Sequence, residues 1–158
     1  MNTFDVVIRF ADEADFGAIE SLINANFPND PPISKQTIAS WLAVGGRVIV
    51  AVAPHQIIGC VRMDPEREGL FHLVVVPELR KNGLGARLVA EFEFAARQLG
   101  WPHVLLGVDT STDELVRYYR RLGYKLRGDV VPMFDHAGNE DPGRKLIMMM
   151  KVLPSART

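Results

Sequence analysis

The chain has 158 residues, of which 47% are hydrophobic and 23% are charged, so its composition is that of one ordinary globular domain and not of a disordered chain. The formal charge of −1 gives no electrostatic reason to expect a nucleic acid or an anionic membrane as a partner. The single cysteine, Cys60, excludes an intramolecular disulfide, and the histidines have no metal-ligand spacing, so we expect no metal. No apolar run reaches the roughly 20 residues of a membrane span and no signal peptide is evident, which predicts a cytoplasmic protein with a single domain over residues 1–158.

The first elements expected along the chain are a short apolar strand over 6–10 and a helix that Asp12 caps. Three prolines make 26–32 a loop, because proline removes a backbone donor and interrupts regular structure. Ser34 then caps a second expected helix, which ends at a pair of glycines.

Strands and helices alternate in the rest of the chain. Two β-branched runs, 47–53 and 57–63, predict a hairpin, and the almost wholly apolar run 70–76 predicts a central strand. A stripe of apolar residues at helical spacing predicts a long helix over 83–99, followed by a buried strand over 104–108. The last expected elements are a short helix between Ser111 and Gly123, where Ser111 and Glu114 have the spacing of a capping box, and strands over 130–134 and 146–152. This order predicts a mixed α/β sheet.

The most informative stretch is the passage from the central strand into the long helix. Gly83 and Gly85 remove side chains where the first N–H groups of the helix point outward, and these groups attract an anion together with the helix dipole. Arg80 and Lys81 add positive charge, so a phosphate or a pyrophosphate fits the turn. On spacing alone, glycines that merely free the backbone of a turn explain the pattern equally well. A P-loop motif is absent, and a dinucleotide fingerprint would need a third glycine near Leu88.

Two motifs together resemble a known family. Arg80-x-x-Gly83-x-Gly85, after a strand that ends Val74-x-Val76, resembles the acetyl-CoA signature of the GCN5-related N-acetyltransferase (GNAT) family. Further along, Tyr118-Tyr119-Arg120-Arg121-Leu122-Gly123-Tyr124 is similar to the family's aromatic-Tyr-x-x-x-Gly-aromatic segment. Ile8-Arg9 before a first helix that carries Asp15 also fits, so the resemblance covers nearly the whole chain.

The resemblance implies an α/β fold, the acyl-CoA N-acyltransferase (GNAT) fold, with a mixed, mostly antiparallel sheet of about seven strands flanked by helices. Strands 70–76 and 104–108 would splay where the cofactor enters. The implied reaction is direct transfer of an acetyl group from acetyl-CoA, as co-substrate, to a primary amine, with neither a metal nor an acyl-enzyme. The alternative is an acyl-CoA-binding sensor or structural module without turnover.

The resemblance also implies which residues bind the cofactor. Backbone groups of Val74 and Val76 would pair with the pantetheine amides, and the Arg80 side chain would hold the pyrophosphate with the turn's N–H groups. Thr112 stands where the family usually has an asparagine, so contacts made by that amide are in question. The full set of implied cofactor-binding residues is Val74, Val75, Val76, Arg80, Lys81, Asn82, Gly83, Leu84, Gly85, Ala86 and Thr112.

Two residues are candidates for proton transfer. The resemblance implies that Tyr119 lies near the sulfur and protonates the leaving thiolate, although its spacing also fits a core aromatic residue. Many family members place a glutamate on the strand before the turn as general base, whereas this chain has Phe71-His72 there. His72 can accept the amine proton directly or through water, or it can face away from the site. Cys60 lies in an apolar run and is expected to be a small buried residue and not a nucleophile.

The acceptor amine is the least determined part. In the family fold, the segments 27–32 and 129–145 would line the acceptor side. Asp30, Asp135, Glu140 and Asp141 lie in them and would suit a cationic acceptor, but we favour ordinary loop acidity as their explanation. A small amine, an amino acid, an antibiotic and a protein amine stay open as acceptors. Among these we expect a small molecule, acted on by a monomer or a homodimer.

Overall fold

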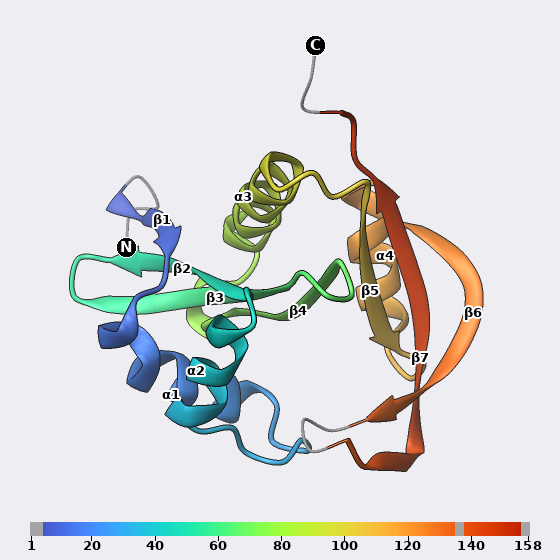
Figure 1. Ribbon diagram of the computed structural model, residues 1–158, viewed down its shortest axis with the longest axis horizontal. Helices are drawn as coiled ribbons and strands as arrows, with labels where there is room; N and C mark the ends of the chain where they lie inside the picture. The colour runs from blue at the N-terminus through green and yellow to red at the C-terminus, as the bar shows by residue number, and fades with distance from the viewer. Residues whose placement is uncertain (1–4, 135–137, 156–158) are drawn as a thin grey trace.

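The computed structural model describes residues 5–134 and 138–155, and within them seven strands form one mixed sheet in the order β1-β2-β3-β4-β5-β7-β6 (Figure 1). All neighbouring strands are antiparallel except β4 and β5, which confirms the expected mixed sheet. The strands are β1 Val7–Phe10, β2 Arg47–Ala53, β3 Gln56–Asp64, β4 Gly69–Val75, β5 His103–Asp109, β6 Lys125–Phe134 and β7 Glu140–Val152. The helices are α1 Phe16–Asn26, α2 Lys35–Ala43, α3 Leu84–Gln98 and α4 Asp113–Arg121, with short 3₁₀ turns η2 Glu13–Asp15 and η3 Pro77–Leu79. None of the described helices is long and apolar enough to cross a membrane.

The sheet separates two hydrophobic cores, because alternate side chains of a strand point to opposite faces. Helices α1 and α2 cover one face of β2–β4, and α3 covers the other (Figure 1). Ile19, Ile38 and Trp41 pack beneath α1 and α2, whereas Leu88 and Phe92 of α3 pack on the opposite side. Helix α4 adds its aromatic residues to the core on the α3 side.

Strands β4 and β5 touch at one end only. Their register holds the single pair Gly69 and Leu105, and the Leu105 N–H donates to the Glu68 carbonyl oxygen at 2.9 Å. Beyond this pair the two strands diverge, so the expected splay is present. The open end faces the turn that begins α3, and it exposes backbone groups that no neighbouring strand of the sheet satisfies.

A bulge in β4 contains one candidate residue, His72. Cys60 pairs with Val74, but Arg62 pairs with Phe71, so β4 holds one residue more than β3 between these pairs. His72 lies inside the bulge with φ 51°, a left-handed conformation that is uncommon outside glycine. The Cys60 thiol lies against it, with 3.6 Å between its Sγ and the His72 carbonyl oxygen.

Two local predictions are wrong. Helix α4 begins after Thr112, so no capping box forms on Ser111; the Ser111 N–H and hydroxyl instead donate to the Asp109 carboxylate at 2.9 and 2.7 Å. Strands β6 and β7 begin earlier than the apolar runs suggested, at Lys125 and Glu140, and none of the added residues is fully buried. Hydrophobic patterning detects only the part of a strand that is buried.

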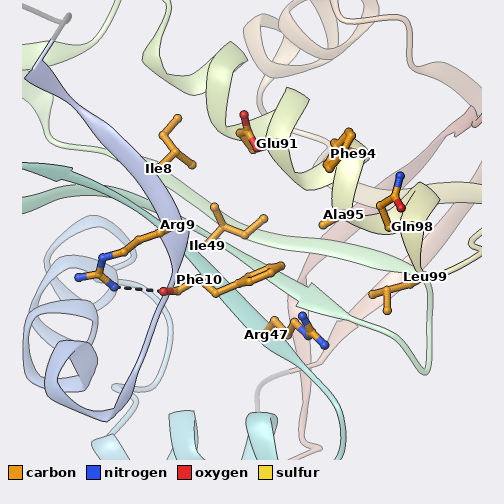
Figure 2. Close-up of a pocket in the computed structure, with 10 residues that line it drawn as sticks. All are labelled: Ile8, Arg9, Phe10, Arg47, Ile49, Glu91, Phe94, Ala95, Gln98 and Leu99. Carbon is orange, nitrogen blue, oxygen red and sulfur yellow. Dashed lines mark hydrogen bonds between the residues drawn. The ribbon is translucent and has the colours of Figure 1, made fainter.

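An apolar groove of about 280 Å³ lies between β1 and α3 (Figure 2). Phe10 and Phe94 are 44% and 58% exposed on its two sides, and the Arg47 guanidinium lies 4.8 Å from the centre of the Phe10 ring. None of its lining residues belongs to the turn that begins α3, so the groove is separate from the site described next.

Candidate active site

The turn before α3 has the backbone of an anion site. Lys81 and Gly83 have φ of 69° and 79°, and such left-handed residues turn successive N–H groups toward a common centre. The first helical bond runs from the Arg87 N–H to the Gly83 carbonyl oxygen, and no side chain caps the helix. The N–H groups of the first turn therefore have no partner within the helix. A Cβ atom built on Gly83 would meet nothing within 4 Å, so the turn is open to a ligand.

The Arg80 side chain reaches back from this turn toward α1. Its Nε donates to the Val75 carbonyl oxygen at 3.0 Å, and its Nη2 donates to Asn26 Oδ1 at 2.8 Å. The guanidinium thus lies beside the turn and links it to the end of α1. Lys81 and Asn82, two further expected cofactor-binding residues, are exposed in the turn.

The backbone groups of β4 face differently from the expectation. The Val76 N–H donates to the Ile58 carbonyl oxygen at 2.9 Å, so Val76 faces β3. Because backbone direction alternates along an antiparallel strand, Val74 faces β3 as well. Leu73 and Val75 direct their backbone groups into the gap between β4 and β5. The backbone groups of Val74 and Val76, which were expected to meet pantetheine, are therefore directed at β3 and not at the gap.

Tyr118 closes the other side of the turn, which the sequence did not suggest. Its hydroxyl lies so near Gly85 that a Cβ atom built on this glycine would be 2.6 Å from Tyr118 Oη. The ring is half-buried, and burial raises the pKa of its phenol. Gly85 is thus a point of close approach between α3 and α4. The only sequence signal for this contact was the position of Tyr118, directly before the motif residue Tyr119.

Tyr119 lies deeper, on the α3 side of the sheet. It is 8% exposed and packs edge-to-face against Tyr118 and Tyr124, with ring centres 5.2 and 5.8 Å away. Burial raises the pKa of the Tyr119 phenol above its ordinary value, so the group stays protonated and can donate a hydrogen bond. Thr112 takes the N-cap position of α4, but its side chain makes no capping bond.

His72 lies on the opposite face, against the ends of α1 and α2. Its ring is stacked on Trp41 at 5.5 Å between centres and meets Phe27 edge-on at 5.3 Å. Val74, two residues further along β4, packs in the same core, so alternation along the strand places both side chains on the α1 and α2 side. His72 and Tyr119 therefore lie on opposite faces of the sheet.

The partly buried Arg62 side chain lies on the same side of the sheet as the Trp41 ring. The Arg62 guanidinium lies 4.1 Å from the centre of the Trp41 ring and 5.1 Å from that of Phe71, and burial lowers its pKa. Cys60 is fully buried, which raises the pKa of its thiol to about 12. A thiol that stays protonated is a poor nucleophile, as the sequence predicted.

The two segments expected to line the acceptor side meet in space. A cavity of about 290 Å³ lies between the α1–α2 loop and the β6–β7 hairpin, which come together at the foot of the view in Figure 1. Asp135 lies outside the described residues. In the part of the chain that the structure describes, no three His, Cys, Asp or Glu side chains gather to hold a metal ion. The cavity is lined by Asn29, Asp30, Pro31, Met133, Asn139, Glu140, Asp141, Pro142 and Arg144.

The amino-acid sequence is similar to that of known proteins. A curated relative from Danio rerio, "Probable N-acetyltransferase 14", is 34% identical over 105 residues. The match covers 63% of this chain but 38% of the relative, so the chain spans well under half of that relative's length. A family model described as an acetyltransferase (GNAT) domain matches residues 44–126, which is more than half of the chain.

Solved structures share the fold. The ribosomal-protein-alanine N-acetyltransferase from Brucella melitensis is 22% identical with a TM-score of 0.75, over 93% of this chain and 99% of that one. A GNAT family acetyltransferase from Elizabethkingia anophelis, with acetyl-CoA bound, is 19% identical with a TM-score of 0.71, over 94% and 99%. A phosphinothricin acetyltransferase from Sinorhizobium meliloti, in complex with acetyl-CoA, is 20% identical with a TM-score of 0.74, over 98% and 92%. With the matched family model, this fold shows that the chain belongs to the GNAT family of N-acetyltransferases.

Proposed function

We propose that the chain transfers the acetyl group of acetyl-CoA directly to a primary amine. The observation that supports this most is the uncapped, left-handed turn that opens α3 beside the gap between β4 and β5. The turn suits a pyrophosphate, and the gap suits an extended arm that pairs with a strand edge. The described elements would act as one catalytic domain.

Residues of the turn would hold the co-substrate. The N–H groups from Lys81 to Ala86 would bind the pyrophosphate, with Arg80 beside them. The Val75 N–H and the backbone groups of Leu73 would pair with the pantetheine amides, while the Val75 carbonyl oxygen already accepts from Arg80 Nε. Gly83 leaves room for this approach, because a side chain there would occupy the open space above the turn.

The two residues that we propose for proton transfer, His72 and Tyr119, lie on opposite faces of the sheet. An ammonium has no lone pair, so the amine first gives a proton to His72, directly or through water. The amine nitrogen then attacks the thioester carbonyl carbon, a C–N bond forms, and the C–S bond breaks as the sulfur takes its electron pair. The nitrogen loses its second proton as the amide forms, and one proton is taken up by the thiolate, which leaves as free CoA thiol. Tyr119 would donate to that sulfur, mainly as a hydrogen bond, because burial makes its phenol a weak acid.

We propose a small-molecule amine as the acceptor. Phe27 and Trp41 would form an aromatic wall beside the reacting amine, because both rings pack on His72. A wall of flat rings suits a compact acceptor that enters the gap. Among the solved relatives, one is named for phosphinothricin and another for a ribosomal-protein alanine, so the family fold accommodates both acceptor classes.

The test has two steps. Melting is measured with and without millimolar acetyl-CoA, and with NAD or ATP as control ligands; a ligand at a hundred times its Kd stabilises by about 2.7 kcal/mol. Release of free thiol is then measured with a panel of small amines and with a peptide that has a free N-terminal alanine. Stabilisation with turnover supports the proposal. Stabilisation without any turnover favours the acyl-CoA sensor instead, and no stabilisation contradicts both.

A further inference from the structure

Arg144 connects the two halves of the molecule at the open end of the sheet. The halves β1–β4 and β5–β7 share the one strand pair at Gly69 and Leu105, so the sheet itself does not hold their far ends together. Arg144 lies on β7, in the second half. Asp30, which it reaches, belongs to the α1–α2 loop of the first half.

The guanidinium bridges carboxylates from both halves. Its Nη1 donates to Asp30 Oδ1, and its Nε lies 3.3 Å from Asp109 Oδ2 at the end of β5. A third carboxylate, that of Asp141, lies 3.9 Å away. The Arg144, Asp30 and Asp109 side chains are each only about a quarter exposed, at 27%, 22% and 25%. Such partly buried, shared pairs are screened less than ion pairs that are open to solvent.

On the first half, this contact leads to the aromatic wall. The Asp30 N–H donates to the Phe27 carbonyl oxygen at 3.1 Å, so both residues belong to one tight turn. The Phe27 ring in turn lies 5.3 Å from the His72 ring. Movement of Asp30 would therefore move the ring that packs on the candidate base.

On the second half, the contact leads to the helix that carries Tyr119. The Asp109 carboxylate accepts bonds from the Ser111 N–H and hydroxyl, and its carbonyl oxygen accepts the Thr112 N–H at 3.0 Å. These bonds shape the turn that leads into α4. Arg144 thus acts on both sides of the gap through one side chain.

We propose that Arg144 is a positioning residue that links the Phe27 and His72 rings to the start of α4. This link sets the width of the gap between β4 and β5 at the end where the acceptor would enter. This inference rests on the proposed acetyl transfer. Arginine suits the task because its planar fork serves two carboxylates at once, whereas a lysine ammonium is a single point charge. Arg144 would therefore affect binding of the amine and not of acetyl-CoA, because a wider gap holds the amine less well and leaves the turn that opens α3 unchanged.

The experiment compares the variants Arg144→Gln, Arg144→Lys, Asp30→Asn and Asp109→Asn with the wild type. The matched control is Arg127→Gln, which removes an exposed pair with Asp129 on the neighbouring strand β6, where both side chains are 43% exposed. Amide hydrogen exchange is measured over 26–30 and 109–115. We expect Arg144→Gln to speed exchange of the Asp30 amide about ten-fold, Asp30→Asn to do the same, and Arg127→Gln to leave it unchanged.

Kinetics then separate positioning from general destabilisation. With the best amine of the panel, Arg144→Gln should raise the KM for the amine about ten-fold, which is about 1.4 kcal/mol, with the KM for acetyl-CoA within two-fold. Arg144→Lys should recover part of the loss. Wild-type exchange at 26–30 in Arg144→Gln, or equal rises in both KM values, overturns the inference. A wild type that turns over no amine refutes the proposed function and with it any role for Arg144 in amine binding, whereas the exchange data judge the link itself.

Discussion

The contact between Gly85 and Tyr118 makes a test of the turn that needs no substrate. In Gly85→Ala, the new methyl group would lie 2.6 Å from Tyr118 Oη, well inside the 3.4 Å at which ordinary contacts begin. The hydroxyl must shift, and overpacking of this kind costs about 1–3 kcal/mol. Alanine gains up to about 1 kcal/mol over glycine inside a helix, so the net loss should be about 0–2 kcal/mol.

The sign should reverse once the tyrosine oxygen is removed. In Tyr118→Phe the nearest atom to the new methyl group becomes the ring carbon Cζ, at 3.7 Å, which is an ordinary contact. Gly85→Ala in that background should therefore stabilise the protein by up to about 1 kcal/mol. The coupling between the two positions would then be about 1–3 kcal/mol.

Urea unfolding of the four proteins of this double-mutant cycle measures the coupling directly. Gly17→Ala is the control, since its methyl group would meet only the flexible end of Lys35, at 3.3 Å, on the far side of the sheet. Its effect should be the same with Tyr118 or Phe at position 118. Equal effects of Gly85→Ala in both backgrounds would show that the Tyr118 hydroxyl does not lie against the first turn of α3.

Three further predictions concern catalysis, cofactor binding and pH. Tyr119→Phe should lower kcat about a hundred-fold or less, at the low end of general acid catalysis, while the melting shift caused by CoA stays at the wild-type value; an unchanged kcat would exclude Tyr119 as the donor. Gly83→Val should fold with a loss of about 1–2 kcal/mol, because φ is 79° there, and should lose the CoA-induced melting shift; a retained shift would place the anion site elsewhere. The hydrogen bond from Arg9 to Asp15, at 2.7 Å, lowers the pKa of this carboxyl in the folded state. The stability it contributes is present above the unfolded pKa of about 3.9 and is lost as pH falls through the lower folded pKa. Asp15→Asn should therefore be less stable than wild type at pH 7, and its free energy of unfolding should fall less between pH 5 and pH 2 in urea titrations. Parallel pH curves would contradict this.

Local sequence was enough to predict the elements whose signals are local. The bounds of β2 match the expected run 47–53, and α3 is within one residue of 83–99 at each end. The glycine spacing and the apolar strand before it predicted the turn that opens α3 for the same reason. Backbone freedom and the unpaired N–H groups of a helix start depend only on neighbouring residues.

Tertiary structure decided what depends on partners far along the chain. The backbone groups of Val74 and Val76 face β3, because the Val76 N–H pairs with the Ile58 carbonyl oxygen. No pattern within 70–76 reveals this register. The left-handed backbone of His72 occurs at a bulge, which is a mismatch in residue count between two strands that β4 alone does not reveal.

The bridge from Arg144 to Asp30 shows the same limit most clearly, since 114 residues separate its ends. A lone arginine in a polar hairpin and a lone aspartate in a proline-rich loop carry no sign of each other in the sequence. Chain composition and periodicity record which residues a segment buries. The sheet order and the splay of β4 and β5 decide which distant side chains meet, because both arise from packing of the whole molecule.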